Sequence, residues 1–158
     1  MLCENERYWI VIIKLINNNY LKLLLIMSYQ LYTDGASRGN PGKACVGIVI
    51  KEDSKTIFKD SKYLGDNITN NIAEYSSLEF GLESLINNEY NISKLEIFMD
   101  SKLVISQLKG EWKLRNDKFI PLFYNIKEML KRFPEVELTH IPRKLNQEAD
   151  EMANYKFL

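Results

Sequence analysis

The chain has few residues of the kinds that bind zinc or form disulfides. Its 158 residues include two cysteines, Cys3 and Cys45, and one histidine, His140. Cys45 lies within an apolar run and no Cys-x-x-Cys pair occurs, which fits a reducing compartment, so we expect a cytoplasmic protein. A single histidine excludes histidine-rich metal sites and leaves zinc hydrolysis poorly supported. The metal chemistry that the composition favours is that of a hard cation held by oxygen ligands.

The chain also lacks an excess of charge of either sign. Its formal net charge is zero, which argues against a polycation that coats nucleic acid without selectivity. Residues 101–132 differ from this average, because they include eight basic and three acidic residues, for a net charge of +5. The basic residues are Lys102, Lys109, Lys113, Arg115, Lys118, Lys127, Lys131 and Arg132. This stretch indicates either a local nucleic-acid-binding patch or a solvated helix face.

No apolar run is long enough to cross a membrane. Residues 8–13 and 21–26 are apolar, but lysines and asparagines interrupt them, and a span needs about 20 mostly apolar residues. The features of a signal peptide are missing as well. We therefore predict no membrane association and interpret residues 1–26 as an N-terminal extension of unknown role. The alternatives are a natural start at Met27 and a weak interfacial helix.

From residue 28 onward the pattern predicts one α/β domain, which we place at residues 27–158. The hydrophobic content of 46% and the charged content of 27% are ordinary for a globular domain. We predict strands over residues 29–33, 44–51, 56–63, 94–99 and 135–141, and helices over 69–88, 101–108, 117–133 and 146–155. The first strand ends at Asp34, and the glycine- and proline-rich residues 35–42 form a loop. The helix after the third strand permits a crossover to a parallel strand, so the sheet is mixed and covered by helices.

Four acidic residues lie where apolar runs end or helices begin. Asp34 and Asp100 follow predicted strands, and Glu74 and Asp150 lie near the starts of predicted helices. An acidic residue at any one of these positions, taken singly, is more often a helix cap or a surface charge. Four converging carboxylates would repel one another unless divalent cations neutralised them. Such a set is how a protein holds a pair of Mg²⁺ ions for phosphodiester hydrolysis.

Four motifs resemble ribonuclease H type 1, and the resemblance covers Ser28 to the C-terminus. They are Tyr-Thr-Asp34-Gly-Ala-Ser-Arg-Gly-Asn-Pro-Gly, Thr69-Asn-Asn-Ile-Ala-Glu74, Met-Asp100-Ser, and His140 followed by Asn146-Gln-Glu-Ala-Asp150. The resemblance is to the shorter bacterial and archaeal branch, without the inserted basic helix. It implies a ribonuclease H-like fold, with a five-stranded mixed sheet and helices on both faces. It also implies a monomeric endoribonuclease that cleaves the RNA strand of RNA–DNA hybrids with two Mg²⁺ or Mn²⁺ ions.

The resemblance also assigns the site residues. Asp34, Glu74, Asp100 and Asp150 would be both catalytic and metal-binding. His140 has the family's spacing to Asp150 for a histidine that assists catalysis or product release, but it is also compatible with a silent strand end. In this branch, Arg143 is a second candidate for handling phosphate.

Substrate binding is assigned to two groups of residues. By resemblance, Gly35, Ser37, Asn40, Asn70 and Asn71 contact the minor groove, where 2′-hydroxyls are displayed, Thr69 and Asn116 grip a DNA phosphate, and Trp112, Lys113 and Arg115 form a stacking and electrostatic surface. The alternative for each asparagine is a turn or cap residue.

Three other functions remain open. One is a ribonuclease of broader specificity that acts on double-stranded or structured RNA. A second is a nucleic-acid-binding module that has lost catalysis, against which the four intact acids argue. A third is a domain of a reverse transcriptase, which we do not expect because no polymerase or linker sequence precedes Ser28 or follows Leu158.

Overall fold

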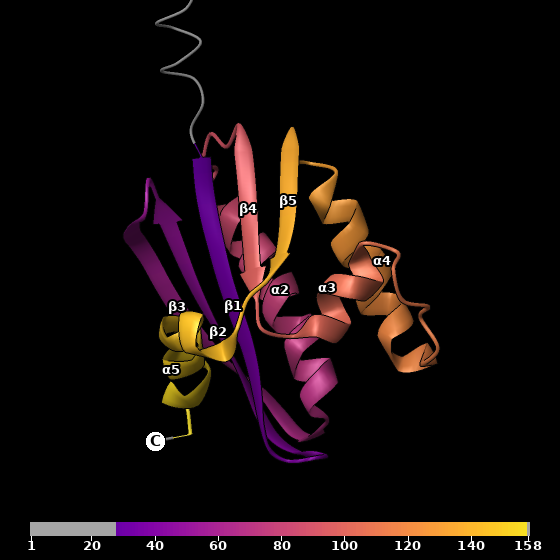
Figure 1. The fold of residues 1–158 in the computed structure, drawn as a ribbon. Coiled ribbons are helices and arrows are strands. Elements are labelled where there is room, and N and C mark those ends of the chain that lie inside the picture. The colour runs from indigo at the N-terminus through magenta and orange to yellow at the C-terminus, as the bar shows by residue number, and fades with distance from the viewer. Residues whose placement is uncertain (1–27, 158) are drawn as a thin grey trace, which may run out of the picture.

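A computed structural model describes residues 28–157 of the chain, and its centre is one five-stranded mixed sheet (Figure 1). The strand order is β3-β2-β1-β4-β5. The first three strands pair antiparallel, whereas β4 is parallel to β1 and β5 is parallel to β4. The strands are β1 Ser28–Gly39, β2 Gly42–Glu52, β3 Lys55–Ile68, β4 Lys94–Met99 and β5 Glu135–His140. This confirms the predicted five-stranded α/β fold.

Helices cover both faces of the sheet, as the sequence predicts. Figure 1 shows α5 on the opposite side of the sheet from α2. The helices are α2 Asn70–Asn87, α3 Lys102–Leu108, α4 Ile120–Leu130 and α5 Gln147–Tyr155, with short 3₁₀ turns at Asp117–Phe119 and Arg143–Leu145. Within residues 28–157, none of the helices has both the length and the apolarity needed to cross a membrane.

The main core lies between α2 and the central strands. Leu31 of β1 and Ile97 of β4 are paired neighbours and are fully buried. On α2, Leu78, Leu82 and Leu85 are buried at helical spacing and belong to the same cluster. Side chains alternate along a strand and recur every three or four residues on a helix, so the two patterns meet on one face of the sheet. This packing fixes α2 against β1, which carries the first of the four acids.

The prediction that β1 ends at Asp34 is wrong, because β1 continues to Gly39. Pairing with β4 stops at Tyr32, which lies opposite Phe98, but antiparallel pairing with β2 continues to Gly39 opposite Gly42. The predicted loop over residues 35–42 is therefore a strand followed by a tight turn. Its glycine-rich composition resembles a loop, although one neighbouring strand is enough to hold the backbone extended.

Two other elements end three or more residues away from the predicted position. β3 runs on to Ile68, well beyond residue 63, because it stays paired with β2 past a bulge. The predicted helix over residues 117–133 begins as the 3₁₀ turn and becomes α4, which ends at Leu130. Element ends are the least determined feature of a sequence pattern, because termini depend on tertiary contacts.

A close backbone approach packs α5 against β2. A Cβ atom built on Gly47 would lie 2.2 Å from the backbone nitrogen of Ala153 and 2.4 Å from the carbonyl oxygen of Ala149. Glu148 at the start of α5 also forms ion pairs with Lys51 at 2.5 Å and Lys59 at 2.7 Å. The absence of a side chain at residue 47 therefore sets how closely α5, which carries Asp150, lies to the sheet.

Replacing Gly47 with alanine should destabilise the fold by roughly 2 kcal/mol or more, because the added methyl group meets backbone that cannot rotate away. Chemical denaturation followed by circular dichroism measures the change. Gly81→Ala is the matched control, because the nearest atoms to its Cβ belong to side chains rather than to backbone, Leu31 at 2.9 Å and Thr33 at 3.1 Å, and alanine favours the helix. Equal stability of the two variants would contradict the close-packing account.

Candidate active site

Beyond Tyr32, the edge of β1 has no strand partner on the side of β4. β4 ends at Met99, so the peptide groups of β1 that follow must bind other groups. The side-chain nitrogen of Asn146 donates to the carbonyl oxygen of Thr33 at 2.9 Å, and the backbone nitrogen of Gly35 donates to the Glu74 carboxylate at 3.3 Å. Side chains from two different helices thus take the place of a missing strand at one notch in the sheet.

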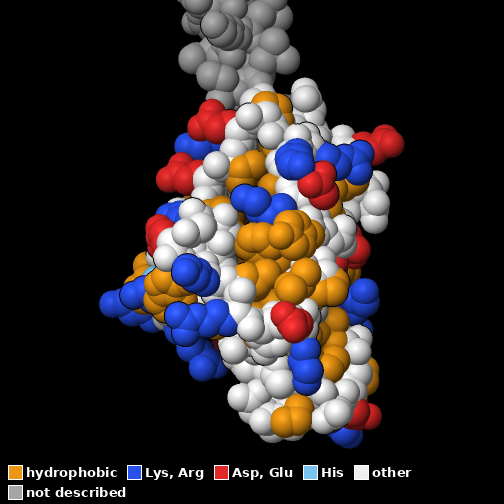
Figure 2. All heavy atoms as spheres, turned by 90° about the vertical axis from the view of Figure 1, so that its right-hand side faces the viewer, with side chains coloured by type: hydrophobic (Ala, Val, Ile, Leu, Met, Phe, Trp, Pro, Cys, Tyr) orange, Lys and Arg blue, Asp and Glu red, His pale blue; other side chains and the backbone are white. Residues whose placement is uncertain are grey.

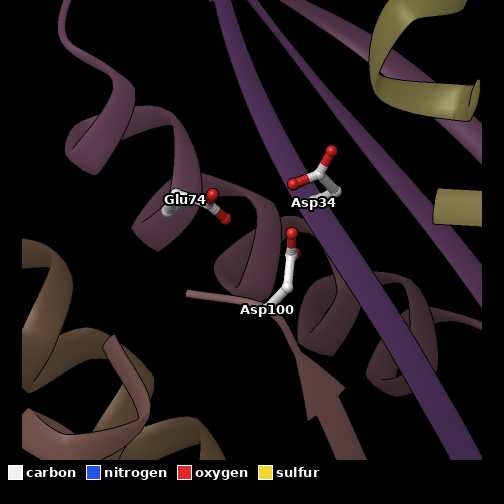
Figure 3. Close-up of side chains that lie close together, drawn as sticks. All are labelled: Asp34, Glu74 and Asp100. Atoms are coloured by element: carbon white, nitrogen blue, oxygen red, sulfur yellow. The ribbon is translucent and has the colours of Figure 1, made fainter. Parts of the chain in front are cut away.

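Three of the four predicted acids meet at this notch. Carboxylate oxygens of Asp34, Glu74 and Asp100 lie within 4.8 Å of one another. Figure 3 shows the three side chains converging from β1, from α2 and from the segment after β4. Asp34 and Glu74 are almost fully buried, and Asp100 is partly exposed. The predicted adjacency of β1 and β4 is confirmed, and it places Asp34, within β1, near Asp100, the residue that follows β4.

Glu74 reaches the notch because α2 lies directly on β1. A Cβ atom on Gly35 would lie 2.2 Å from the backbone carbon of Ala73. Only glycine permits this approach, since every other residue would push the helix away. Gly35 was predicted to contact substrate, and the structure gives it a second role in placing Glu74.

The burial and close approach of these carboxylates are electrostatically unfavourable in the absence of cations. Burial, followed by the charges of Asp100 and Asp150, raises the pKa of Asp34 to about 7. Burial, followed by the charges of Asp34 and Asp100, raises the pKa of Glu74 well above its usual value, although the Gly35 N–H opposes this. A compact set of carboxylate oxygens that repel one another fits a hard divalent cation.

Asp150 lies at the same hollow but is paired with arginine. Arg143 donates to Asp150 at 2.6 Å, and this hydrogen bond raises the pKa of the guanidinium. The hollow has a volume of about 350 Å³ and is lined by Asp34, Gly35, Ala36, Ser37, Asn70, Glu74, Asp100, Arg143, Asp150 and Asn154. His140 is exposed at the end of β5, opposite Met99, and is not among the lining residues. The structure therefore brings Arg143, rather than His140, to the acids.

Several predicted substrate-binding residues tie β1 to the start of α2. The Ser37 hydroxyl donates to the Ile68 carbonyl at 2.7 Å, and Asn40 accepts from the Asn70 backbone at 3.1 Å. Thr69 is the N-cap of α2 and accepts from the Ile72 N–H, as the sequence predicts. Asn71 is exposed in the first turn of the helix. Ser37 and Asn70 line the hollow, and part of the hydrogen-bonding capacity of these residues is used within the protein.

The remaining predicted binding residues line a second hollow, between α3 and the segment that leads to the 3₁₀ turn at Asp117–Phe119. Its volume is about 530 Å³, and it is lined by Leu103, Gln107, Glu111, Trp112, Lys113, Arg115, Asn116 and Phe119. Figure 2 shows this side of the molecule, where hydrophobic side chains form a band with Lys and Arg side chains beside it. Asn116 caps the 3₁₀ turn by accepting from Lys118 at 3.0 Å. Only residues 109–116 join α3 to this turn, which confirms that an inserted helix is absent.

The sequence reasoning did not assign a role to two site residues, Asn146 and Asn154. Asn154 lines the hollow and donates to the Asp150 carbonyl at 2.8 Å. Asn146 is buried and donates to Asp100 at 2.9 Å. Both are four residues from Asp150, one helical turn on either side. That spacing was visible in the sequence and could have marked them as its neighbours.

The five-stranded mixed sheet and the clustered acids define a ribonuclease H-like domain. The family model described as "Reverse transcriptase-like" matches residues 32–156. Ribonuclease HI of Halobacterium salinarum is 36% identical over 124 residues, which cover 78% of this chain and 61% of that protein. A protein of Mycobacterium tuberculosis described as bifunctional is 34% identical over 129 residues, 81% of this chain. The chain spans 35% of that relative's length.

Solved structures agree with these matches. The crystal structure of RNase H1 from Halobacterium salinarum has a TM-score of 0.78 and 34% identity, covering 82% of this chain and 97% of that one. LC11-RNase H1, crystallised in complex with an RNA/DNA hybrid, has a TM-score of 0.76 and 36% identity, covering 80% and 94%. The chain therefore belongs to the ribonuclease H family.

The repulsion among the acids predicts a pH-dependent stability in the absence of divalent cations. The folded pKa of Asp34 of about 7 lies above its usual value of 3.8, so between these values the folded state holds a proton that the unfolded state releases. The free energy of unfolding should then fall as the pH rises from about 4 to 7 and level off above 7. Asp34→Asn should weaken this dependence and raise stability at pH 8 by on the order of 2 kcal/mol.

Denaturant unfolding in EDTA at several pH values tests this prediction. Asp60→Asn is the control, because Asp60 lies on β3 away from the acidic cluster. A variant at residue 34 that is less stable than the wild type at pH 8 would contradict the repulsion.

Proposed function

We propose that this protein is an endoribonuclease that cleaves the RNA strand of RNA–DNA hybrids by metal-dependent phosphodiester hydrolysis. The observation that best supports this proposal is the cluster of Asp34, Glu74 and Asp100, whose carboxylate oxygens lie within 4.8 Å of one another at a hollow open to solvent. Support comes from relatives named as ribonuclease HI and from LC11-RNase H1, which was crystallised with an RNA/DNA hybrid.

The proposed metal ligands are Asp34, Glu74, Asp100 and Asp150, with Mg²⁺ or Mn²⁺ as the cations. When bound, two such ions would activate a water and stabilise the leaving oxygen of the scissile phosphate. The chain's own contribution is a set of carboxylates held in place by β1, α2 and α5 before substrate arrives. A bound cation would relieve their repulsion, so the folded centre favours cation binding.

Arg143 is proposed to bind phosphate at the same hollow. Its guanidinium is three-quarters exposed and already within hydrogen-bonding distance of Asp150. A planar cation in this position can turn from a carboxylate to a phosphate oxygen with little movement. His140 is kept as the alternative group that assists catalysis or product release, from its spacing to Asp150 alone.

The substrate is proposed to extend from the acidic hollow to the second hollow. Trp112, Lys113 and Arg115 offer stacking and positive charge to a nucleic-acid backbone. Gly35, Ser37, Asn40, Asn70 and Asn71 are proposed to contact the minor groove, and Thr69 and Asn116 a DNA phosphate.

We also propose that residues 27–158 form the ribonuclease H domain. Residues 1–26 lie outside the described residues, and we propose that they are an extension. The match of the family model from residue 32 onward supports this division. The few cysteines support a cytoplasmic location.

Cleavage of matched labelled RNA–DNA, RNA–RNA and DNA–DNA duplexes with Mg²⁺ and Mn²⁺ tests the proposed function. We expect cleavage of the RNA strand of the hybrid alone. Asp100→Asn should lower this rate at least ~100-fold, because it removes a metal-binding charge, while its circular dichroism spectrum stays unchanged. A chain that begins at Met27 should cleave as fast as the full chain.

The outcomes separate the alternatives. Equal cleavage of RNA–RNA would favour the broader ribonuclease, and binding without cleavage would favour the inactive binding module. Retention of most activity by Asp100→Asn would contradict the proposed metal centre.

Replacing both Lys113 and Arg115 with glutamine should raise the KM for hybrid and leave kcat nearly unchanged. Both residues line the second hollow rather than the acidic one. Each lost phosphate contact should reduce the slope of log K against log salt by about one. Steady-state kinetics and binding at several salt concentrations measure both effects.

The charge-matched control replaces Lys55 and Lys62, which are exposed on β3, at the far edge of the sheet. If this control weakens binding as much as the pair in the second hollow, general charge rather than a local surface explains hybrid binding.

A further inference from the structure

Asn146 stands at the N-cap of α5 but does not cap its helix. An asparagine at this position normally accepts a hydrogen bond from a backbone N–H in the first turn, which stabilises the helix. Here the side chain makes no such bond. Its Nδ2 instead donates to the carbonyl oxygen of Thr33 and to Oδ1 of Asp100, both at 2.9 Å. The first turn of α5 therefore lacks a side-chain cap, and the Asn146 amide binds the acidic centre instead.

The position of the amide also leaves one of its own atoms unsatisfied. Asn146 is 1% exposed, and its Oδ1 is buried without a hydrogen-bond partner among the described residues. An unpaired buried acceptor costs stability. Two unfavourable features at one residue indicate that the two donated hydrogen bonds matter more than the stability of α5.

Asn146 connects to three of the four acids. Its amide bonds Asp100 directly and holds the peptide of Thr33, the residue before Asp34. Its backbone carbonyl accepts from the N–H of Asp150 at 3.0 Å. One residue therefore links the end of β4, the free edge of β1 and the first turn of α5, each of which carries one acid.

We propose that Asn146 is a positioning residue of the acidic centre, which orients the Asp100 carboxylate relative to Asp34 and Asp150. This inference rests on the proposed metal-dependent function. An N–H donated to a carboxylate forms a charge-assisted hydrogen bond, which restricts rotation of the carboxylate and offsets part of the repulsion from its neighbours. Groups that orient metal ligands in this way commonly affect metal affinity or activity 10–100-fold.

The first test compares Asn146→Asp and Asn146→Ser. The aspartate has the same size but cannot donate, and the serine is a strong N-cap residue but too short to reach both acceptors. Both variants should lower kcat about 10–100-fold with the KM for hybrid within about twofold. Mn²⁺ binding measured by electron paramagnetic resonance without substrate should weaken by a similar factor. Asn125→Ser, which removes an exposed amide bonded to Glu79, is the control and should change neither quantity.

Unchanged Mn²⁺ affinity in Asn146→Ser, or an effect on KM alone, would overturn the proposal. If Asn146→Asp does not fold, Asn146→Ser still gives this result. Because Mn²⁺ binding is measured without substrate, it tests the positioning role even if the wild-type protein does not cleave hybrid, a result that would count against the proposed function only.

A double-mutant cycle distinguishes positioning of Asp100 from a purely structural bond to Thr33. Asn146→Ser, which adds no charge, should lower the Tm of the metal-free protein more when residue 100 is aspartate than when it is asparagine, because only the aspartate loses a charge-assisted hydrogen bond. An equal drop in Tm in both backgrounds would show that Asn146 acts through the backbone of β1 alone and would overturn the proposal.

Discussion

The central constraint of this structure is the free edge of β1. β4 stops at Met99 while β1 continues alongside β2 to Gly39, so the peptide groups after Tyr32 lose their strand partner on one side. Buried peptide groups must be hydrogen-bonded, and here Glu74 and Asn146 supply the bonds. The same notch that requires these side chains also gives the acids access to solvent.

The acidic centre is held together by packing that works against its charge. Gly35 and Gly47 allow α2 and α5 to approach opposite faces of the sheet so closely that a methyl group at either position would overlap backbone. This places Glu74 and Asp150 beside Asp34 although burial and mutual repulsion raise the pKa values of Asp34 and Glu74. The acidic centre thus lowers the stability of the metal-free protein, and a divalent cation would remove the repulsion. Such a local cost is common at functional sites.

The two hollows divide the proposed work between chemistry and binding. The acidic hollow is lined in part by β1, α2 and α5, whereas the second hollow lies between α3 and the segment after it and carries Trp112, Lys113 and Arg115. Tyr75, next to Glu74 on α2, donates to Gln107, and Gln107 donates to the carbonyl of Lys113. The short connection between α3 and α4 is therefore anchored to the helix that carries Glu74.

The sequence alone determined the element order, the mixed sheet and the four acids, because hydrophobic periodicity and short motifs are local properties of the chain. It did not determine that β1 passes through Asp34, since the end of a strand depends on how far its neighbours continue. The contact between Arg143 and Asp150 also could not be predicted from the sequence, because it depends on the path of the turn after β5. The role of Asn146 likewise required the tertiary structure, since a residue that resembles a helix cap binds two groups that are 113 and 46 residues away.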